Sequence, residues 1–498
     1  MHTDTERCLS AVRGKDARFD GWFFTAVVTT GIYCRPSCPV VPPKASNVRF
    51  HPSAAAAQAA GFRACKRCRP DASPGSPEWD LRSDVVARAV RLIADGVVDR
   101  EGVPGLSARL GYSRRQLERL LHAELGAGPL GLARAQRAQT ARLLVETTVM
   151  PLADVALAAG FGSVRQFNDT VREVFATTPG DLRARSRRDE PTVAGTIILR
   201  LPFRVPLWPD NLFGHLAATA VPGVEEWRDG AYRRTLRLPH GTGVVALSPR
   251  AGHVTCRLAL TDLRDLSVAI ARSRRLLDLD ADPVAVDAQL GEDPVLAPLV
   301  AAAPGRRVPR TVDEQELALR AVLGQQVSTA AARTHAGRLV AALGEQIVDP
   351  AGGLTSLFPT AAAVSEVNPA SLALPRARIR TLLGLARALA DGDIDLDPGA
   401  DREQARAELL ALPGIGPWTV ETIAMRALGD PDAFLPTDLG VAVLAQQLGL
   451  PTGAGLVAHA ERWRPWRAYA VQHLWAVGDH AVNVLPTELA PTRSGGPS

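Results

Sequence analysis

The chain has 498 residues, about three times the roughly 150 residues of a typical domain, so several domains are expected. Its composition, 46% hydrophobic and 22% charged, excludes a disordered, collagen-like or disulfide-scaffold protein. No apolar run approaches the roughly 18 to 20 residues of a membrane span, and the first residues lack the apolar stretch of a signal peptide. These features predict a cytoplasmic protein without a membrane partner.

Charge is distributed unevenly along the chain. Residues 1–190 carry 28 Lys and Arg against 20 Asp and Glu, whereas the remainder carries 29 against 32. A basic excess in one region is typical of nucleic-acid binding, because Lys and Arg displace counterions from phosphate. A solvated basic surface explains the charge equally well.

Composition and periodicity divide the chain into four predicted domains. A Pro-, Ser- and Gly-rich stretch at 71–77 and an Arg-rich stretch at 183–192 separate a cysteine-rich start, a helical segment and a β-rich segment. The short β-rich runs, which favour antiparallel pairing, are Ile197–Leu201, Tyr232–Leu238, Val244–Leu247 and Val254–Leu260. The fold class is therefore multi-domain and mainly α with α+β parts, and the predicted domains are 1–75, 80–188, 195–282 and the all-α 283–490.

Four cysteines in the first 70 residues have the spacing of metal ligands. Cys34 and Cys38 are separated by three residues, Cys65 and Cys68 by two, and 26 residues lie between the pairs. Four thiolates at such spacing suit one tetrahedral Zn²⁺. A closed, unreactive structural zinc site is the alternative to a reactive one.

The residues around these cysteines favour a reactive zinc site over a purely structural one. The segments 30–38 (TGIYCRPSC) and 61–70 (GFRACKRCRP) closely resemble the zinc domain of the Ada DNA-alkylation response proteins, over most of residues 7–72. The resemblance implies that Cys34 accepts a methyl group from a DNA methylphosphotriester, with Cys38, Cys65 and Cys68 as its co-ligands on one Zn²⁺. Residues expected to contact phosphate, unless they are merely solvated, are Arg35, Arg63, Lys66, Arg67 and Arg69.

Methylation would change the charge of such a centre. Four thiolates on one Zn²⁺ carry a net charge of −2, and converting one to a thioether leaves −1. Because repulsion toward phosphate then falls, the methylated form is predicted to bind DNA more tightly.

An internal repeat follows. The segments 111–117 (GYSRRQL) and 160–167 (GFGSVRQF) repeat at an offset of 49 to 50 residues, each between two apolar helical patterns. This predicts two helix-turn-helix units whose second helices enter the major groove, with a generic helical bundle as the alternative. The second copy resembles the AraC-type signature, although Ala176 stands where that signature has Gly. The expected DNA-reading residues are Ser113, Arg114, Arg115, Ser163, Arg165 and Gln166.

A tight turn near the C-terminus predicts a further DNA contact. The segment 412–417 (LPGIGP) lies between two helical patterns, and Gly414 and Gly416 permit a hairpin whose backbone N–H groups face a phosphate. Asp438, 24 residues after Gly414, begins the next helix, where a plain N-cap is the alternative role. From Ile197 to about Asp479 the chain resembles the helix-hairpin-helix DNA glycosylases, and is most similar to 3-methyladenine DNA glycosylase II.

This resemblance implies that Asp438 is the catalytic residue. A carboxylate can stabilise the oxocarbenium charge that develops as an N-glycosidic bond breaks, and can orient or activate water. Trp418 and Trp475 match aromatic pocket positions, with core packing as the alternative. The pocket tyrosine of the family is Thr422 here.

Two further features of the resemblance concern the rim of the pocket. Gln326, next to Gln325, stands where an apolar wedge into the DNA strand is expected, and both are candidate substrate contacts. The resemblance also implies a monovalent cation held by the backbone carbonyls of Leu410, Leu412 and Ile415.

Two chemistries lack the residues that they require. Glycosylases that also cut the backbone carry a lysine where this sequence has Trp418, and no lysine follows Lys66. Only Cys256 follows Cys68, so no iron–sulfur cluster is expected. The enzyme is therefore predicted to be a monofunctional N-glycosyl hydrolase.

Together these motifs predict a bifunctional alkylation-damage response protein. It would excise alkylated bases such as 3-methyladenine, while methyl transfer to Cys34 switches on sequence-specific DNA binding. The expected partners are double-stranded DNA and RNA polymerase, and the expected location is cytoplasmic and nucleoid-associated. The alternative is a non-enzymatic methylation-sensing regulator whose glycosylase-like part only supplies DNA affinity, but the intact Asp438 beside an intact hairpin favours catalysis.

Overall fold

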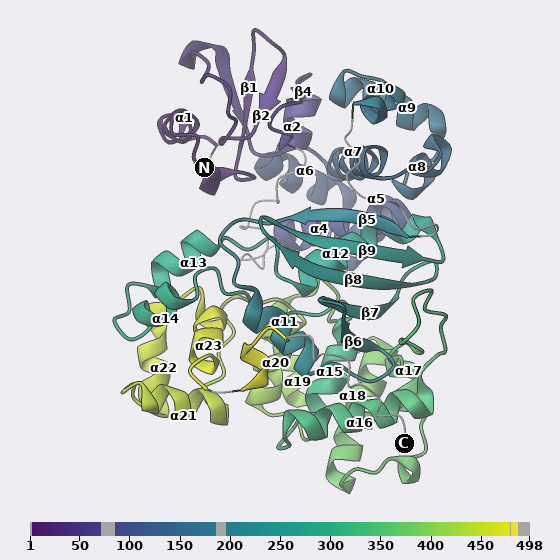
Figure 1. Ribbon diagram of the computed structural model, residues 1–498, viewed down its shortest axis with the longest axis vertical. Coiled ribbons are helices and arrows are strands. Elements are labelled where there is room, and N and C mark those ends of the chain that lie inside the picture. Colours follow the sequence, from purple (N-terminus) through teal and green to yellow (C-terminus); the bar gives the residue numbers. More distant parts are fainter. Residues whose placement is uncertain (1, 71–84, 186–195, 479, 487–498) are drawn as a thin grey trace, which may run out of the picture.

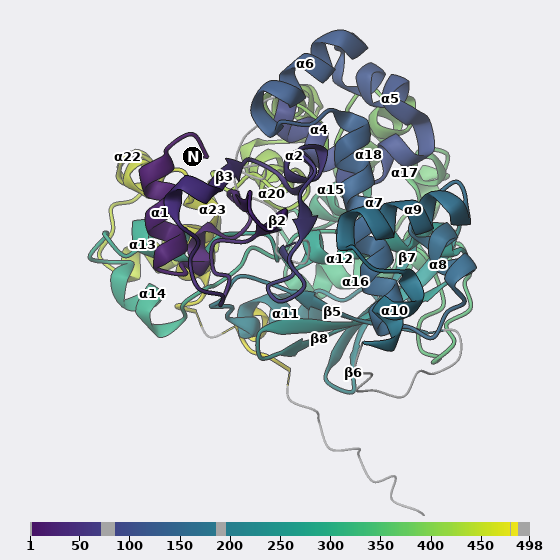
Figure 2. The same ribbon diagram turned by 90° about the horizontal axis from the view of Figure 1, so that it is seen from above.

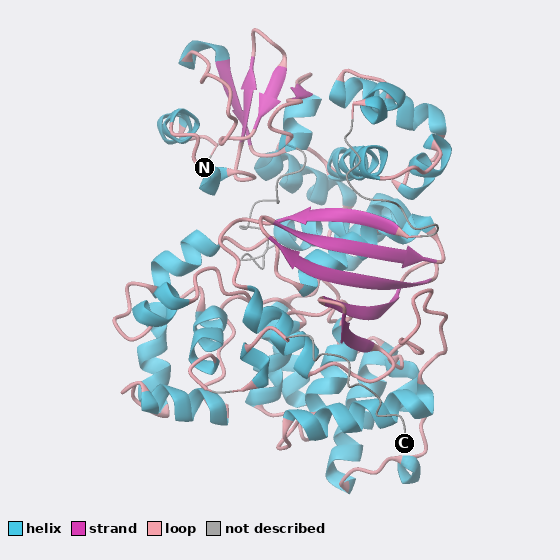
Figure 3. Cartoon of the chain, viewed as in Figure 1, coloured by secondary structure: helices cyan, strands magenta, loops and turns pink. Residues whose placement is uncertain are grey.

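The computed structural model describes residues 2–70, 85–185, 196–478 and 480–486. These form an N-terminal unit (2–70), a helix-turn-helix unit (85–185) and a C-terminal half (196–486). The predicted boundaries near 75–80 and 188–195, the end at 490 and Asp479 lie outside the described residues. The mainly helical, multi-domain architecture with two sheets confirms the predicted fold class (Figure 3).

The N-terminal unit is built on a four-stranded sheet of order β3-β1-β2-β4. Strand β1 pairs antiparallel with β2 and β3, whereas β2 pairs parallel with β4. Since Tyr33 pairs with Ala64, the parallel pairing brings Cys34 and Cys65 to the same end of the sheet. The elements are α1 (Thr5–Arg13), η1 (Ala17–Phe19), β1 (Phe24–Val27), β2 (Ile32–Cys34), η2 (Ala45–Asn47), β3 (Val48–His51), α2 (Ala54–Ala59) and β4 (Arg63–Ala64).

The helix-turn-helix unit contains two short three-helix groups joined by the long helix α7. Both predicted second helices form, α6 after the turn at Gly111 and α9 after the turn at Gly160. Helix α9 ends at Phe175, and its C-cap Ala176 has φ of 51° in the left-handed region. The helices are α4 (Val85–Ala94), α5 (Val97–Leu110), α6 (Arg114–Leu125), α7 (Pro129–Thr147), α8 (Leu152–Ala158), α9 (Val164–Phe175) and α10 (Pro179–Ala184).

The C-terminal half begins with a five-stranded antiparallel sheet of order β5-β9-β8-β7-β6. The four β-rich runs of the sequence correspond to β5, β7, β8 and β9. Strand β6 was missed because it is charged, and its buried Glu225 is paired with Arg234 and Arg320. The elements are β5 (Ile197–Pro202), α11 (Pro209–Ala218), β6 (Glu225–Arg228), β7 (Ala231–Arg237), β8 (Thr242–Arg250), β9 (His253–Leu260), η4 (Leu263–Asp265) and α12 (Leu266–Leu276).

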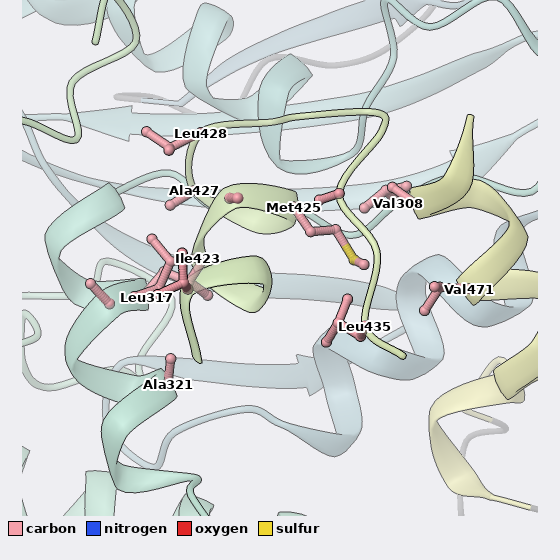
Figure 4. Close-up of a cluster of buried hydrophobic side chains, with 14 of the residues drawn as sticks. Val308, Leu317, Ala321, Ile423, Met425, Ala427, Leu428, Leu435 and Val471 are labelled. Atoms are coloured by element: carbon pink, nitrogen blue, oxygen red, sulfur yellow. The ribbon is translucent and has the colours of Figure 1, made fainter. Parts of the chain in front are cut away.

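Helices make up the rest of the C-terminal half and enclose the largest hydrophobic core. In that core α20 packs against α15, with Ile423 beside Leu317, and Met425 lies between Val308 and Leu435 (Figure 4). The helices are α13 (Pro283–Leu290), α14 (Ala297–Ala302), α15 (Glu314–Leu323), α16 (Thr329–Leu343), α17 (Ala361–Ser365), η5 (Pro369–Ser371), α18 (Arg376–Asp391), α19 (Arg402–Ala411), α20 (Pro417–Arg426), α21 (Leu439–Gln447), α22 (Ala454–Ala460), η6 (Glu461–Trp463), α23 (Arg467–Trp475) and η7 (Ala481–Asn483).

The three parts of the chain pack against one another. The N-terminal and helix-turn-helix units lie side by side along the sheet of the C-terminal half (Figures 1 and 2). One hydrophobic cluster contains Tyr33, Phe167 and Leu258, one residue from each part. No helix among the described residues combines the length and apolarity needed to cross a bilayer.

Candidate functional sites

Asp438 lies at the N-cap of α21, and its carboxylate accepts a hydrogen bond from each of the two predicted pocket tryptophans. Its Oδ2 accepts a hydrogen bond from Nε1 of Trp418 (2.8 Å), and its Oδ1 accepts one from Nε1 of Trp475 (2.9 Å). The backbone N–H of Val441 also donates to Oδ1 at 2.9 Å, so the N-cap role holds as well. Three donors and the positive end of α21 therefore stabilise a negative charge on this carboxylate.

The two indoles reach Asp438 from different helices. Trp418 lies in the first turn of α20, and Trp475 is the last residue of α23. Both side chains are half-buried. Both indoles direct their N–H groups at the same carboxylate. The Thr422 hydroxyl donates back to the Trp418 carbonyl at 2.7 Å.

Two residues that sequence reasoning missed hold Trp475 in place. A Cβ on Gly440 would lie 3.1 Å from Oδ1 of Asp438 and 3.3 Å from the Trp475 ring, so the missing side chain admits the indole. Asn483 donates from Nδ2 to the carbonyls of Trp475 (2.8 Å) and Gly478 (3.0 Å). A glycine in the first turn of a helix was the available signal for Gly440.

The predicted hairpin joins α19 to α20, and its two glycines have different environments. Gly414 has φ of 87°, and a Cβ there would lie 2.0 Å from Oγ1 of Thr381, so the fold itself requires glycine. Gly416 has φ of −103°, and a Cβ there would meet no atom of the described residues within 4 Å. Open space at the N-terminus of α20 suits the close approach of a phosphate.

Gln325 and Gln326 take different positions beside the hairpin. The side-chain amide of Gln325 donates to the Gly414 carbonyl and to Oγ1 of Thr419, both at 3.0 Å, so it braces the turn. Gln326 is exposed and has φ of 54°, which places it at the tip of the loop before α16. Of these two predicted substrate contacts, Gln326 is the one whose side chain is free to meet DNA.

The backbone carbonyls predicted to hold a monovalent cation belong to the same turn. That of Leu412 accepts the N–H of Ile415 at 3.1 Å, which is an ordinary turn hydrogen bond. The cation site remains a prediction.

The four predicted zinc ligands form one cluster. The Sγ atoms of Cys34, Cys38, Cys65 and Cys68 all lie within 4.8 Å of one another, and all four residues are buried. Four thiolates each about 2.3 Å from a tetrahedral Zn²⁺ lie roughly 3.8 Å apart, so these side chains fit the ion.

The other two cysteines differ in chemistry from the cluster. Burial raises the pKa of Cys8 to about 11 and that of Cys256 to about 12, so both remain protonated thiols at neutral pH.

The predicted phosphate contacts near the cluster differ in their contacts with the fold. Arg63, Lys66, Arg67 and Arg69 are exposed, and Arg63 donates to the Thr30 carbonyl at 3.4 Å. Arg35 is ion-paired with Asp20 at 3.2 Å, and Arg69 pairs with Glu146 of α7. The last two side chains therefore also support the fold.

The predicted DNA readers also divide by role. Ser113 and Ser163 cap α6 and α9 by accepting the N–H of the residue three positions later. Gln166 turns back, and its Oε1 accepts the N–H of Gly162 at 3.2 Å. Arg114, Arg115 and Arg165 are exposed, and Nε of Arg165 lies 3.9 Å from the Asp169 carboxylate.

Comparison with known proteins accounts for this combination of sites. Three family models match consecutive parts of the chain: the metal binding domain of Ada over residues 7–71, a helix-turn-helix domain over 106–185, and the AlkA N-terminal domain over 198–313. Together with the cysteine cluster and the hairpin site, they define a DNA-alkylation response protein that joins a regulator to a DNA glycosylase.

Full-length relatives identify the family. The chain is 63% identical over 492 residues, covering 98% of this chain and 99% of the relative, to a "Probable bifunctional transcriptional activator/DNA repair enzyme AlkA" of Mycobacterium tuberculosis. It is 35% identical to DNA-3-methyladenine glycosylase 2 of Escherichia coli, covering 53% of this chain and 92% of the relative. The chain therefore belongs to the family of bifunctional transcriptional activator/DNA repair enzymes, as predicted.

A solved structure shows the fold of the C-terminal half. The 3-methyladenine DNA-glycosylase of Archaeoglobus fulgidus matches 56% of this chain and 97% of its own, with a TM-score of 0.50 and 20% identity. At this identity the match supports the glycosylase fold and nothing finer.

Proposed function

We propose that the C-terminal half excises alkylated bases such as 3-methyladenine from DNA, with Asp438 as the catalytic residue. The observation that carries this proposal is the convergence of the Trp418 and Trp475 indole N–H groups on one carboxylate. A helix N-cap needs only a backbone N–H, so two further donors from separate helices go beyond a capping role.

The geometry supports an electrostatic mechanism. The three donors hold the Asp438 carboxylate in one orientation, so its charge would stabilise the positive sugar as the N-glycosidic bond breaks. Val441 and Trp475 both donate to Oδ1, whereas within the described residues Oδ2 accepts one hydrogen bond, from Trp418. Oδ2 therefore keeps acceptor capacity for the attacking water.

Base selection follows from the pocket. An alkylated base is often cationic and leaves readily, so the pocket needs little acid catalysis. Indole faces attract electron-poor, positively charged rings. Trp418 and Trp475 would contact the flipped base. Gly414 and Gly416 would lie against the phosphate, and Gln326 would fill the space that the base leaves in the duplex.

Release of 3-methyladenine from a methylated duplex tests this assignment. Wild type is expected to release the base and Asp438→Asn to lose nearly all activity while remaining folded, because Asn still caps a helix. Asp401→Asn is the matched control, since Asp401 caps α19 through the N–H groups of Glu403 and Gln404. No release by wild type would favour the non-enzymatic regulator.

We also propose that Cys34 accepts methyl groups from DNA methylphosphotriesters. Cys34 and its three co-ligands would hold Zn²⁺, which when bound would keep the Cys34 thiol ionised. The Cys34 sulfur would attack the methyl carbon, the carbon–oxygen bond would break, and the phosphate would leave as an ordinary diester. Cys38, Cys65 and Cys68 would remain thiolate ligands.

Methyl transfer to Cys34 would switch on sequence-specific DNA binding by the helix-turn-helix unit. RNA polymerase is the proposed downstream partner, and the proposed location is cytoplasmic and nucleoid-associated. The test is DNA affinity across a salt series, before and after exposure to a methylating agent. Wild type is expected to gain affinity and Cys34→Ala to show no change. Equal affinities of wild type before and after methylation would contradict the switch.

A further inference from the structure

The loop between Cys34 and Cys38 is held by a residue outside the cysteine motif. The carboxylate of Asp20 accepts the backbone N–H of Ser37 at 3.0 Å on Oδ1 and the Ser37 hydroxyl at 2.6 Å on Oδ2. Oδ2 of Asp20 also lies 3.2 Å from the Arg35 guanidinium. Two of the three residues between the cysteines are thus bound by one side chain, and Asp20 is only 5% exposed.

The backbone of Asp20 is in turn bound by the C-terminal half. The guanidinium of Arg204, in the segment after β5, donates from NH2 to the Asp20 carbonyl at 2.8 Å in a buried contact. Its NH1 donates to the Asp280 carbonyl at 2.8 Å, and the Arg204 carbonyl accepts from Arg307 at 2.7 Å. Arg204 is therefore anchored within the C-terminal half and reaches into the N-terminal unit.

We propose that Asp20 is a positioning residue for methyl transfer at Cys34, and that Arg204 holds Asp20, so that the C-terminal half completes the support of the cysteine cluster. The proposal rests on the proposed methyl-acceptor function. Hydrogen bonds that fix the segment around metal ligands set their orientation, and losing them typically costs about 10- to 100-fold in metal affinity or activity.

The arrangement has a physical logic. A short loop between two ligands must keep two sulfur atoms at a set separation, and Asp20 restrains that loop at Arg35 and Ser37. Arg204 is buried at the contact between the two parts, and its N–H groups donate to the carbonyls of Asp20 and Asp280. Because breaking these hydrogen bonds would leave buried donors without acceptors, Arg204 keeps Asp20 at a fixed distance from the C-terminal half. The loop geometry then depends on how the two parts dock.

The test uses the full-length zinc-loaded chain and two readouts. One is the rate of zinc loss to excess chelator, and the other is the rate of methyl transfer to Cys34 from a methylphosphotriester duplex. Asp20→Ala and Arg204→Met are each expected to speed zinc loss and slow methyl transfer by about tenfold. If Arg204 acts through Asp20, the double variant will be little worse than Asp20→Ala alone.

Controls separate positioning from general destabilisation. Arg272→Met removes a partly buried guanidinium that donates to the Arg237 carbonyl at 2.8 Å and lies 3.6 Å from Asp95 of the helix-turn-helix unit, and it is expected to leave zinc loss at the wild-type rate. Asp20→Asn keeps the size and one acceptor, and should fall between wild type and Asp20→Ala. Melting temperatures identify any variant that fails to fold.

Each outcome is decisive. Wild-type zinc loss and methyl transfer in both Asp20 variants would overturn the positioning role. Effects in the Asp20 variants without any in Arg204→Met, or with additive effects in the double variant, would overturn the role of the C-terminal half. A wild type that holds zinc but takes up no methyl would overturn the methyl-acceptor function, and the zinc-loss rates would still support or overturn the Asp20–Arg204 bridge.

Discussion

The indole N–H of Trp475 donates to Oδ1 of Asp438 at 2.9 Å, across 37 residues of sequence. In the proposed mechanism Trp475 has two roles, because its ring would contact the base while its N–H supports the Asp438 carboxylate. The two roles can be separated by substitution.

Trp475→Phe keeps an aromatic face and removes the N–H donor. Since a hydrogen bond to a charged group contributes about 1.5–3 kcal/mol, the single-turnover rate of base release should fall by roughly 10- to 100-fold with a smaller change in DNA affinity. Trp463→Phe is the matched control, because its indole donates to Asp293 at 2.8 Å in the buried core. That variant should lose stability rather than catalytic rate, and equal rates for Trp475→Phe and wild type would contradict the bond's role.

The two hairpin glycines should respond differently to alanine. Gly414→Ala forces a Cβ against Thr381 at positive φ and should cost about 2 kcal/mol or more in unfolding free energy. Gly416→Ala should unfold like wild type but bind duplex DNA more weakly, because its Cβ enters the space proposed for phosphate. Urea unfolding and fluorescence-anisotropy titration measure the two effects. Unchanged DNA binding by Gly416→Ala would place the phosphate elsewhere.

Ala176 offers a stabilising substitution. It ends α9 with φ of 51°, where a side chain is strained and glycine is not. Ala176→Gly should raise the free energy of unfolding by about 0.5–1 kcal/mol despite the greater chain entropy of glycine. A melting curve measures the gain, and a loss of stability would show that Ala176 is not strained.

His473 should make the C-terminal half sensitive to acid. It is fully buried, neither ring nitrogen has a hydrogen-bond partner among the described residues, and burial, with a smaller contribution from Arg306, lowers its pKa to about 3. The unfolded chain gains this proton near pH 6.5 and the folded chain only near pH 3, so stability is complete above pH 6.5 and falls between these values.

Removing the His473 imidazole should reduce the loss of unfolding free energy as the pH falls. The unfolding free energy of His473→Leu, measured in urea from pH 7 to pH 5, should fall less steeply than that of wild type, by up to about 1.4 kcal/mol per pH unit. Parallel curves for the two proteins would show that His473 takes up its proton while folded.

Sequence patterns predicted elements well where the signal was local. Gly111 and Gly160 indicated the turns before α6 and α9, and both helices begin after them. Strand β6 was missed because Glu225 is charged, and only its pairing with Arg234 and Arg320, distant in sequence, makes its burial possible. Gln325 was expected at the substrate, yet its amide braces the hairpin, a contact 89 residues away in the chain.

The spacing of Cys34, Cys38, Cys65 and Cys68 predicted a zinc site, and the hairpin glycines predicted a phosphate contact, because ligand spacing and tight turns are properties of short segments. The expectation of glycosidic-bond chemistry at Asp438 came from the resemblance to the helix-hairpin-helix glycosylases. Only the tertiary structure decided that two indoles share one carboxylate and that Arg204 reaches Asp20, 184 residues away. Such contacts depend on how separate helices and units dock, and docking is determined by packing over the whole chain rather than by any local pattern.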